Sequence, residues 1–271
     1  DESQRGLAFG LHRAGDTAGA ALGLLIALLV VAFEQRLNTQ LSPATFRALV
    51  AISLLPALLA VVVLIVSARD VKLKPGNVLP KLSLAGFDYR FKFFLVVVVL
   101  FTLGNSSDAF LILRAQERGL SVTAIMAMVL AFNLTYATVS GPAGKLSDRV
   151  GRRRLIVSGW IVYGLIYLGF ALSSAGWQVF GLYALYGLYY GLAEGVGKAL
   201  IADLVLPEQR GTAYGLYNAA VGVTALPASF IAGVLWQGIG SFAGFGPRAP
   251  FLFGASLAFA AAVMLAVWVR K

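Results

Sequence analysis

The sequence contains no cysteine and a single histidine, and few of its residues are charged. Of 271 residues, 13% are charged and 59% are hydrophobic, whereas soluble domains have about 25% charged and about 45–50% apolar residues. Without cysteine there are no disulfides, thiol chemistry or cysteine metal sites, and His12 alone argues against a histidine metal centre. A soluble core could not bury this much apolar surface. The composition therefore predicts an integral membrane protein and excludes a disordered chain, a disulfide scaffold and a nucleic-acid-binding module.

Acidic residues are also scarce, since 12 Asp and Glu stand against 22 Lys and Arg, for a net charge of +10. Such an excess can indicate nucleic acid, but in a membrane protein Lys and Arg gather in the cytoplasmic loops. The sequence offers no Ser–His–Asp set, no phosphate-cradling loop with lysine and no ATPase segment. We therefore expect a protein that is not an enzyme and needs no cofactor.

Eight apolar stretches are long enough to cross a membrane as helices, which need about 20 residues each. Their apolar residues run continuously. In the strands of a membrane barrel, apolar and polar residues would alternate instead. We expect an all-α integral membrane protein with eight transmembrane helices at 6–31, 47–66, 91–113, 121–141, 155–172, 177–204, 211–236 and 250–269.

The loop charges predict how these spans are oriented. Fifteen of the 22 Lys and Arg fall in loops on one side and five on the other, while Arg13 and Lys198 lie inside spans. Because cytoplasmic loops carry the excess of positive charge, both termini are expected in the cytoplasm. We expect a multi-pass protein of a bacterial inner membrane, with the lipid bilayer and not nucleic acid as its partner.

Residues 5–14 (RGLAFGLHRA) and 210–219 (RGTAYGLYNA) are identical at six of ten positions, at an offset of 205 residues. Internal repeats are typical of transporters, although chance similarity between two helices rich in small residues is the alternative. If the first and seventh spans are equivalent, residues 91–271 form a complete six-helix bundle, 1–68 supply the last two helices of a preceding bundle, and 69–90 form a cytoplasmic linker. Four earlier helices would be missing, so we expect a fragment.

The loop after the fourth span contains a specific motif, whose fixed positions are Gly144, Leu146, Asp148, Arg149, Gly151, Arg152 and Arg153. It resembles the signature loop of the major facilitator superfamily, Gly-x-Leu-x-Asp-Arg-x-Gly-Arg-Arg/Lys, at every fixed position. In that family the loop follows the second helix of a six-helix unit, which agrees with the repeat. The resemblance covers the whole chain and implies helices five to twelve of a twelve-helix transporter. We interpret Pro142 and the two glycines as a tight turn between helices.

The resemblance also implies a role for the loop. Its aspartate is expected to clasp the start of a helix in the opposite half while the cytoplasmic gate is shut. A carboxylate is stabilised there by exposed N–H groups and by the positive end of the helix dipole. The expected partner of Asp148 is the start of the first span near Gly6, with Arg5 beside it, and Arg149 and Arg152 are expected to hold Asp148 in place.

Ionisable residues inside membrane spans are costly, so each is a candidate for coupling or substrate binding. Glu194 and Lys198 are spaced i, i+4 and face each other on the sixth span. They form either a self-neutralising structural pair or a proton-coupling carboxylate tuned by its neighbour. Arg13 and Asp16, spaced i, i+3, are expected to pair. Asp108 follows a glycine and three polar residues, which indicate either a broken point in the third span or a locally hydrogen-bonded helix end.

Weaker cavity candidates are polar and aromatic residues of the same helices: Asn105, Asn133, Tyr136, Tyr186, Tyr190 and Asn218. Glycines repeat every four residues at 15, 19 and 23 and at 187, 191 and 195, which predicts close-packing faces. The first set also partly resembles a glycine-rich motif of antiporters in the superfamily, with Leu24 in place of its proline.

These patterns indicate a secondary transporter that moves a small molecule by alternating access. Efflux is the expected direction, and H⁺ is the expected coupling ion because carboxylates lie within the spans, with Na⁺ as the alternative. An uptake symporter for a small polar solute is the second interpretation. A non-transporting membrane scaffold or a membrane-embedded enzyme is the interpretation from another class, and clustered intramembrane histidines would favour the enzyme.

Overall fold

The computed structural model describes residues 5–34, 42–67 and 83–268. Within these ranges the protein is helical, and its only β-type pairing is an isolated bridge between Ile239 and Phe242. The elements are α1 (Arg5–Glu34), α2 (Pro43–Ser67), α3 (Tyr89–Gly104), α4 (Ala109–Glu117), α5 (Val122–Val150), α6 (Arg152–Leu172), α7 (Gly176–Leu204), the short 3₁₀ turn η2 (Pro207–Gln209), α8 (Arg210–Gln237) and α9 (Ala249–Val267).

The helices match the expected all-α membrane fold. Seven stretches of the described residues are long and apolar enough to cross a membrane, with α3 and α4 counted as one span. The eighth expected span is α7, which has 29 residues but is made more polar by its tyrosines and glycines. It is covered by other helices, since it packs against α5, α6, α1 and α8.

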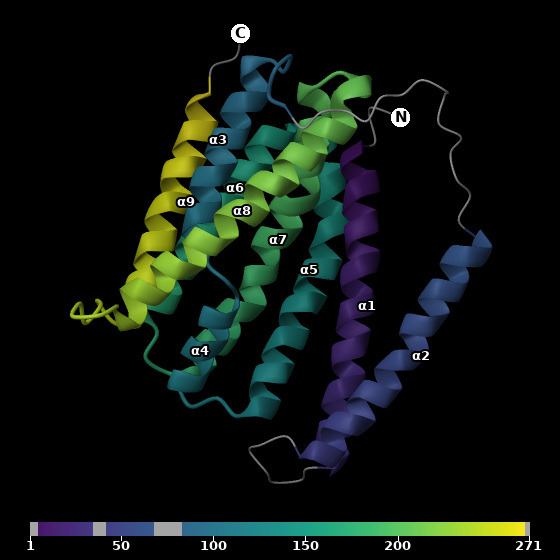
Figure 1. Ribbon diagram of the computed structural model, residues 1–271, viewed down its shortest axis with the longest axis vertical. Helices are drawn as coiled ribbons and strands as arrows, with labels where there is room; N and C mark the ends of the chain where they lie inside the picture. Colours follow the sequence, from purple (N-terminus) through teal and green to yellow (C-terminus); the bar gives the residue numbers. More distant parts are fainter. Residues whose placement is uncertain (1–4, 35–41, 68–82, 269–271) are drawn as a thin grey trace.

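Helices α3 to α9 form one bundle, and α1 lies along its α5 side (Figure 1). Helix α2 touches α1, and nearly all of its apolar surface is exposed. Helix α1 begins and α9 ends at the same end of the bundle, which also holds the turn between α5 and α6 (Figure 1). The two similar ten-residue segments both begin long helices, α1 at Arg5 and α8 at Arg210. Most of the expected linker at 69–90 lies outside the described residues.

Glycines set the distance between α1 and α5. A Cβ added to Gly144 would lie 2.8 Å from the carbonyl carbon of Gly6, and one added to Gly10 would lie 3.2 Å from that of Ser140. The two helices therefore touch backbone to backbone, as small residues allow in membranes.

Close packing was predicted for the glycines of α7 and of α1, and only those of α7 pack closely against described residues. On α7 the prediction is confirmed, because a Cβ on Gly187 would lie 2.6 Å from the carbonyl oxygen of Phe132 on α5. Gly191 meets the side chain of Val139 in the same way. On α1, no described atom lies within 4 Å of a Cβ added at positions 15, 19 or 23. That face of α1 is uncovered in the part of the chain that the structure describes.

The tight turn predicted at Pro142 and Gly144 is wrong. Helix α5 continues through both residues to Val150, and Gly151 alone makes the turn, with a φ of +96° that favours glycine. A proline inside a helix removes one hydrogen bond and bends the helix, which packing on both sides can tolerate. Gly144 serves instead to let α1 approach.

Aromatic rings fill the centre of the bundle between α3, α6 and α7. Tyr163, Tyr167 and Tyr186 are fully buried, and the rings of Tyr163 and Tyr167 stack with centroids 4.1 Å apart. The rings of Phe101 and Trp160 lie nearly parallel, 4.6 Å apart. This core fixes α7 at the centre, because its tyrosines contact three helices at once.

Arg114 of α4 is buried at the end of the bundle where α6 ends, with 1% of its surface exposed. Its guanidinium donates to the carbonyl oxygens of Phe170 at 3.1 Å and Ser173 at 3.0 Å, and it pairs with Glu117 at 2.7 Å. The last carbonyls of α6 have no helical partner, so this arginine satisfies them and complements the negative end of the helix.

Replacing Arg114 with Met should lower the free energy of unfolding by about 1.5–3 kcal/mol, because charged hydrogen bonds to the α6 carbonyls are lost. Unfolding in mixed detergent and SDS micelles measures this change. Arg248→Gln is the matched control, since Arg248 is an exposed arginine of the described chain. Equal stability of both variants would contradict the role of Arg114.

Candidate functional site

The carboxylate of Asp148, in the last turn of α5, lies on the first turn of α1. The backbone N–H of Gly6 donates to Oδ1 at 3.0 Å, and that of Leu7 donates to Oδ2 at 3.1 Å. The first N–H groups of a helix have no partner within the helix, and the positive end of its dipole attracts a carboxylate. The contact expected between Asp148 and the start of the first span is therefore present.

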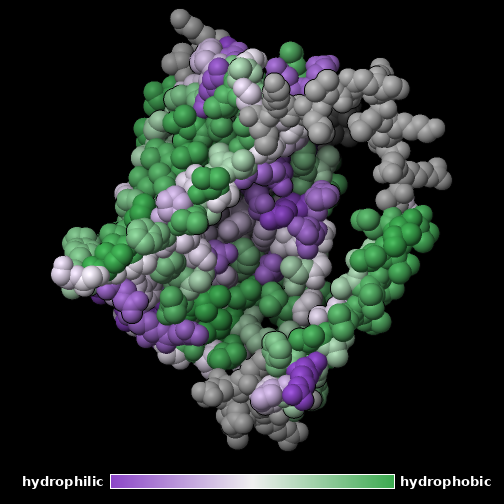
Figure 2. Space-filling model, viewed as in Figure 1, coloured by the Kyte–Doolittle hydropathy of each residue, from purple (hydrophilic) through white to green (hydrophobic). Residues whose placement is uncertain are grey.

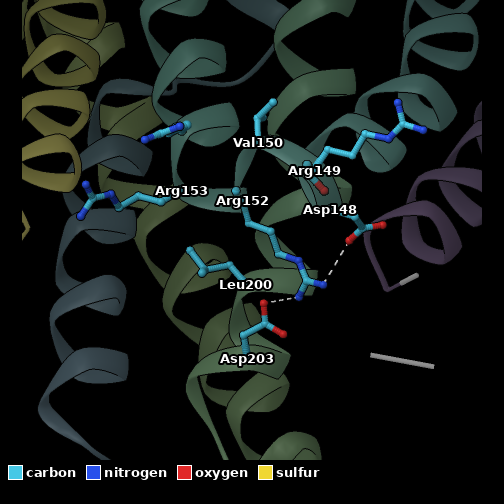
Figure 3. A pocket seen from close by; sticks show the side chains of 10 residues that line it. Asp148, Arg149, Val150, Arg152, Arg153, Leu200 and Asp203 are labelled. Atoms are coloured by element: carbon cyan, nitrogen blue, oxygen red, sulfur yellow. Dashed lines mark hydrogen bonds and ion pairs between the residues drawn. The ribbon is translucent and has the colours of Figure 1, made fainter. Parts of the chain in front are cut away.

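Two arginines and a second aspartate complete this contact. Arg152 lies 3.2 Å from Asp148, donates to the carbonyl oxygen of Ala199 at 2.7 Å and pairs with Asp203 of α7. Arg5 of α1 lies 3.1 Å from the other side of Asp203. We call Arg5, Asp148, Arg152 and Asp203 the clasp. Figure 3 shows Arg152 between the two aspartates. The clasp joins the start of α1 to α5, α6 and α7.

Two other arginines of the motif, Arg149 and Arg153, lie away from Asp148 (Figure 3). Arg149 extends away from Asp148 (Figure 3), so the expectation that it holds this carboxylate is wrong. Arg153 donates to the carbonyl oxygen of Trp268 just after α9. The reason is helical geometry, because Arg152 lies one helical turn beyond Asp148 on the same side, whereas a neighbouring residue points elsewhere.

A second contact between α1 and the bundle lies further along α1. Arg13 pairs with Glu194 of α7 at 2.7 Å and with Asp16 at 2.9 Å, so the expected Arg13–Asp16 pair is present. Arg13 also donates to the hydroxyl of Tyr136 on α5, which in turn donates to Glu194. We call Arg13, Tyr136 and Glu194 the carboxylate cluster.

The expected pairing of Glu194 with Lys198 is wrong. Glu194 turns toward Arg13 and Tyr136, which bring two donors from other helices. Lys198 forms no ion pair with any described residue, although it lies one helical turn further along α7. Spacing along one helix allows a pair, but here the packing of α1 against α7 offers a stronger partner for the carboxylate.

Arg13 and Lys198 both border a partly open cavity of about 260 Å³, which is lined by residues of α1, α3, α6, α7 and α8 and by Asn105. Figure 2 shows hydrophilic side chains gathered in a hollow of this face, between α8 and α1. The cavity is lined by Arg13, Phe94, Val98, Phe101, Thr102, Asn105, Ile156, Trp160, Tyr189, Tyr190, Ala193, Glu194, Gly197, Lys198, Tyr217, Asn218 and Val221.

The cavity brings six of the sequence candidates together, namely Arg13, Asn105, Tyr190, Glu194, Lys198 and Asn218. The other five candidates do not line it, and they include Tyr136 of the carboxylate cluster and Asp108. Asn133 donates to the carbonyl oxygen of Val129 within its own helix, and Tyr186 is fully buried in the aromatic core. Asp16 is largely exposed beside Arg13.

Asp108 lies at the break predicted in the third span. Helix α3 ends at Gly104 and α4 begins at Ala109, so the broken point is confirmed. The side chain of Asp108 does not cap α4 and does not line the cavity. The Asn105 amide oxygen accepts from the hydroxyls of Tyr163 and Tyr186, each at 3.4 Å, which ties the break to the aromatic core.

Sequence reasoning missed the role of Asp203 in the clasp and the apolar wall made by Phe101 and Trp160. The role of Asp203 could have been predicted, because it is a carboxylate in the last turn of the sixth expected span and lies near a basic loop. Nothing local marked the two rings, because aromatic residues occur throughout the spans. In the described ranges, no group of three or more His, Asp or Glu residues could hold a metal ion.

The chain was compared with known proteins. Residues 82–271 match the model of the Major Facilitator Superfamily. An uncharacterized MFS-type transporter of Methanocaldococcus jannaschii is 35% identical over 266 residues, which cover 96% of this chain and 63% of that protein. Multidrug resistance protein 2 of Bacillus subtilis is 32% identical over 50% of this chain and 32% of its own length. The class B tetracycline resistance protein of Escherichia coli is 34% identical over 47% of this chain and 30% of its own length.

No solved structure matches the chain significantly. The chain spans 63% of the length of the archaeal relative and about a third of the other two. The family match extends over well more than half of the chain, from the start of the α3–α9 bundle onward, and it includes the clasp residues of α5, α6 and α7. The chain therefore belongs to the major facilitator superfamily of membrane transporters.

Proposed function

We propose that the chain is part of a secondary transporter that expels a small molecule in exchange for protons by alternating access. The observation that carries this proposal is the double attachment of α1. The clasp holds its first turn, and the carboxylate cluster holds it about 12 Å further along, beside the cavity. Both attachments are charged and reversible, as a gate requires.

The whole protein would have twelve spans in two six-helix halves. Residues 1–68 would supply the last two helices of the first half, 69–90 the linker, and 91–271 the second half. The uncovered glycines of α1 and the exposed surface of α2 support this division, because both would pack against four further helices of the same protein.

In this arrangement the clasp closes one side of the transporter. Asp148 and Arg152 are 12% and 9% exposed, so their contacts are only partly screened by water. Separating α1 from α5 would leave the N–H groups of Gly6 and Leu7 without a partner. The clasp therefore favours the closed state of the end at which α1 begins, which we assign to the cytoplasm from the 15 to 5 distribution of Lys and Arg.

The carboxylate cluster would supply the proton coupling. Ionised Glu194 attracts Arg13 of α1, and a protonated Glu194 would lose most of that attraction. A proton entering the cavity would thus loosen α1 from α7, which links proton binding to gate opening. The names of the bacterial multidrug and tetracycline resistance proteins support efflux as the direction, and we place the protein in a bacterial inner membrane.

Asp148→Asn in the full-length protein should favour the state open at the clasp end and slow turnover. Removing the negative charge weakens the contact with α1 by about 1–2 kcal/mol, which is about a five- to thirtyfold shift in population. Residues 1–271 contain no cysteine, so a Cys at position 221, on the cavity wall, reports opening once any cysteine elsewhere in the full-length protein is replaced. Its labelling by a membrane-impermeant maleimide from the clasp side should accelerate.

Arg149→Gln is the matched control for this experiment. It removes a charge from the same motif, but Arg149 points away from Asp148. Labelling should stay at the wild-type rate. Unchanged labelling and unchanged transport in Asp148→Asn would refute the role of the clasp.

Glu194→Gln should mimic the protonated state of the carboxylate cluster. We expect the Cys at position 221 to be labelled more rapidly than in the wild-type protein, because α1 is held less tightly to α7. The variant should also lose proton-driven transport while keeping substrate exchange, because exchange needs no proton step. The exposed Glu208 provides the control, and Glu208→Gln should be labelled at the wild-type rate.

The direction of transport can be tested with the full-length protein in liposomes under an imposed pH gradient. Labelled tetracycline, followed by a screen of labelled compounds, serves as the probe. An antiporter would concentrate its substrate in the more acidic compartment. Accumulation in the more alkaline compartment would identify a symporter instead, and flux that ignores the gradient would overturn proton coupling.

Residues 1–271 alone should give no flux above protein-free liposomes in the same assay, because half of the proposed cavity wall is missing. Robust flux through these residues would refute the division into two halves. Reconstitution of the full-length protein at the same protein-to-lipid ratio is the control.

A further inference from the structure

One wall of the cavity contains three aromatic rings, those of Phe101, Trp160 and Tyr189. Phe101 of α3 and Trp160 of α6 stack nearly parallel, with an angle of 10° between their planes. Tyr189 of α7 packs against Phe101 at a centroid distance of 5.5 Å. All three residues line the cavity, so an apolar ring inside it would meet other rings. Aromatic pairs of this kind are favourable beyond the area that they bury.

The ion pairs at the cavity are unevenly distributed. Arg13 is shared by two carboxylates, those of Glu194 and Asp16. Lys198 lines the same cavity and is half-buried, but it forms no ion pair with any of the described residues. The lining therefore contains one ammonium group that no described carboxylate contacts.

An unpaired ammonium group within a membrane-spanning helix is costly, and a bound anion would offset that cost. The volume of about 260 Å³ lies just below the range of about 300–1,000 Å³ typical of pockets for drug-sized ligands. This space accommodates a compound with one or two rings. Asn105 and Asn218 add polar groups to the lining that can hydrogen-bond a substituent.

We propose that the cavity binds a small aromatic acid, whose carboxylate contacts Lys198 and whose ring lies against the wall of Phe101, Trp160 and Tyr189. Lys198 is then the residue that selects an anion over a neutral or cationic compound. This inference rests on the proposed transport function for its biological meaning, but binding itself requires only the cavity.

Equilibrium dialysis of the purified full-length protein in detergent tests the inference, with empty micelles as the blank. The probes are labelled 1-naphthoate, its neutral analogue 1-naphthamide and the cation 1-naphthylmethylammonium. We expect 1-naphthoate to bind the most tightly. Lys198→Gln should raise its dissociation constant about tenfold or more, because a charge-assisted contact is lost, and should leave 1-naphthamide unchanged.

Two further variants separate binding from folding. Lys198→Arg keeps the positive charge and should retain most of the affinity for 1-naphthoate. Lys145→Gln removes an exposed lysine of α5 outside the cavity and should bind like the wild type. Trp160→Leu should weaken both 1-naphthoate and 1-naphthamide, because it removes a ring from the wall that both share.

Equal affinity for the three probes, or no effect of Lys198→Gln on 1-naphthoate, would overturn the inference. Lys198-dependent binding without any proton-driven flux would overturn the proposed function and leave this inference standing. Proton-driven flux of other compounds, with no Lys198-dependent binding of 1-naphthoate, would overturn this inference and leave the proposed function standing.

Discussion

The contact between the Asp148 carboxylate and the first turn of α1 positions the rest of the site. The N–H groups of Gly6 and Leu7 need acceptors, and Asp148 reaches both because Gly6 and Gly144 carry no side chain between the two helices. Arg152 holds Asp148 in turn. Once the first turn of α1 is fixed in this way, helical geometry delivers Arg13 to the cavity wall.

The position of α7 in the bundle also depends on polar groups. Its tyrosine hydroxyls and the charged side chains of Glu194 and Lys198 would be poorly solvated in lipid, which accounts for its central position. Glycines at 187 and 191 let it touch α5, and the tyrosines fill the space toward α3 and α6. Glu194 and Lys198 then face the cavity, where Glu194 meets Arg13 and Lys198 meets no carboxylate of the described part of the chain. The position of α7 thus decides both the packing of the core and the electrostatics of the cavity.

Much of the fold was predictable because the relevant signals are local. Continuous apolar runs located the spans, the polar residues after Gly104 located the break between α3 and α4, and glycine spacing located the close-packing face of α7. The turn at Pro142 was not predicted correctly, because proline weakens a helix locally while packing against α1 and α7 keeps α5 intact to Val150. Local propensity was outweighed by contacts made far away in the sequence.

The sequence by itself determined the class of the protein, the positions of its helices along the chain and the residues available for charged contacts, since hydropathy and motif spacing are properties of the chain. Only the tertiary structure decided which charges meet. Glu194 could pair with Lys198 on its own helix, but Arg13 and Tyr136 approach it from α1 and α5 and hold it more strongly. For the same reason Lys198 has no ion pair among the residues that the structure describes. Which cation pairs with a carboxylate in a membrane interior depends on the three-dimensional positions of the donors. Spacing along one helix shows which pairs are possible on that helix, but it does not show which donors approach from other helices.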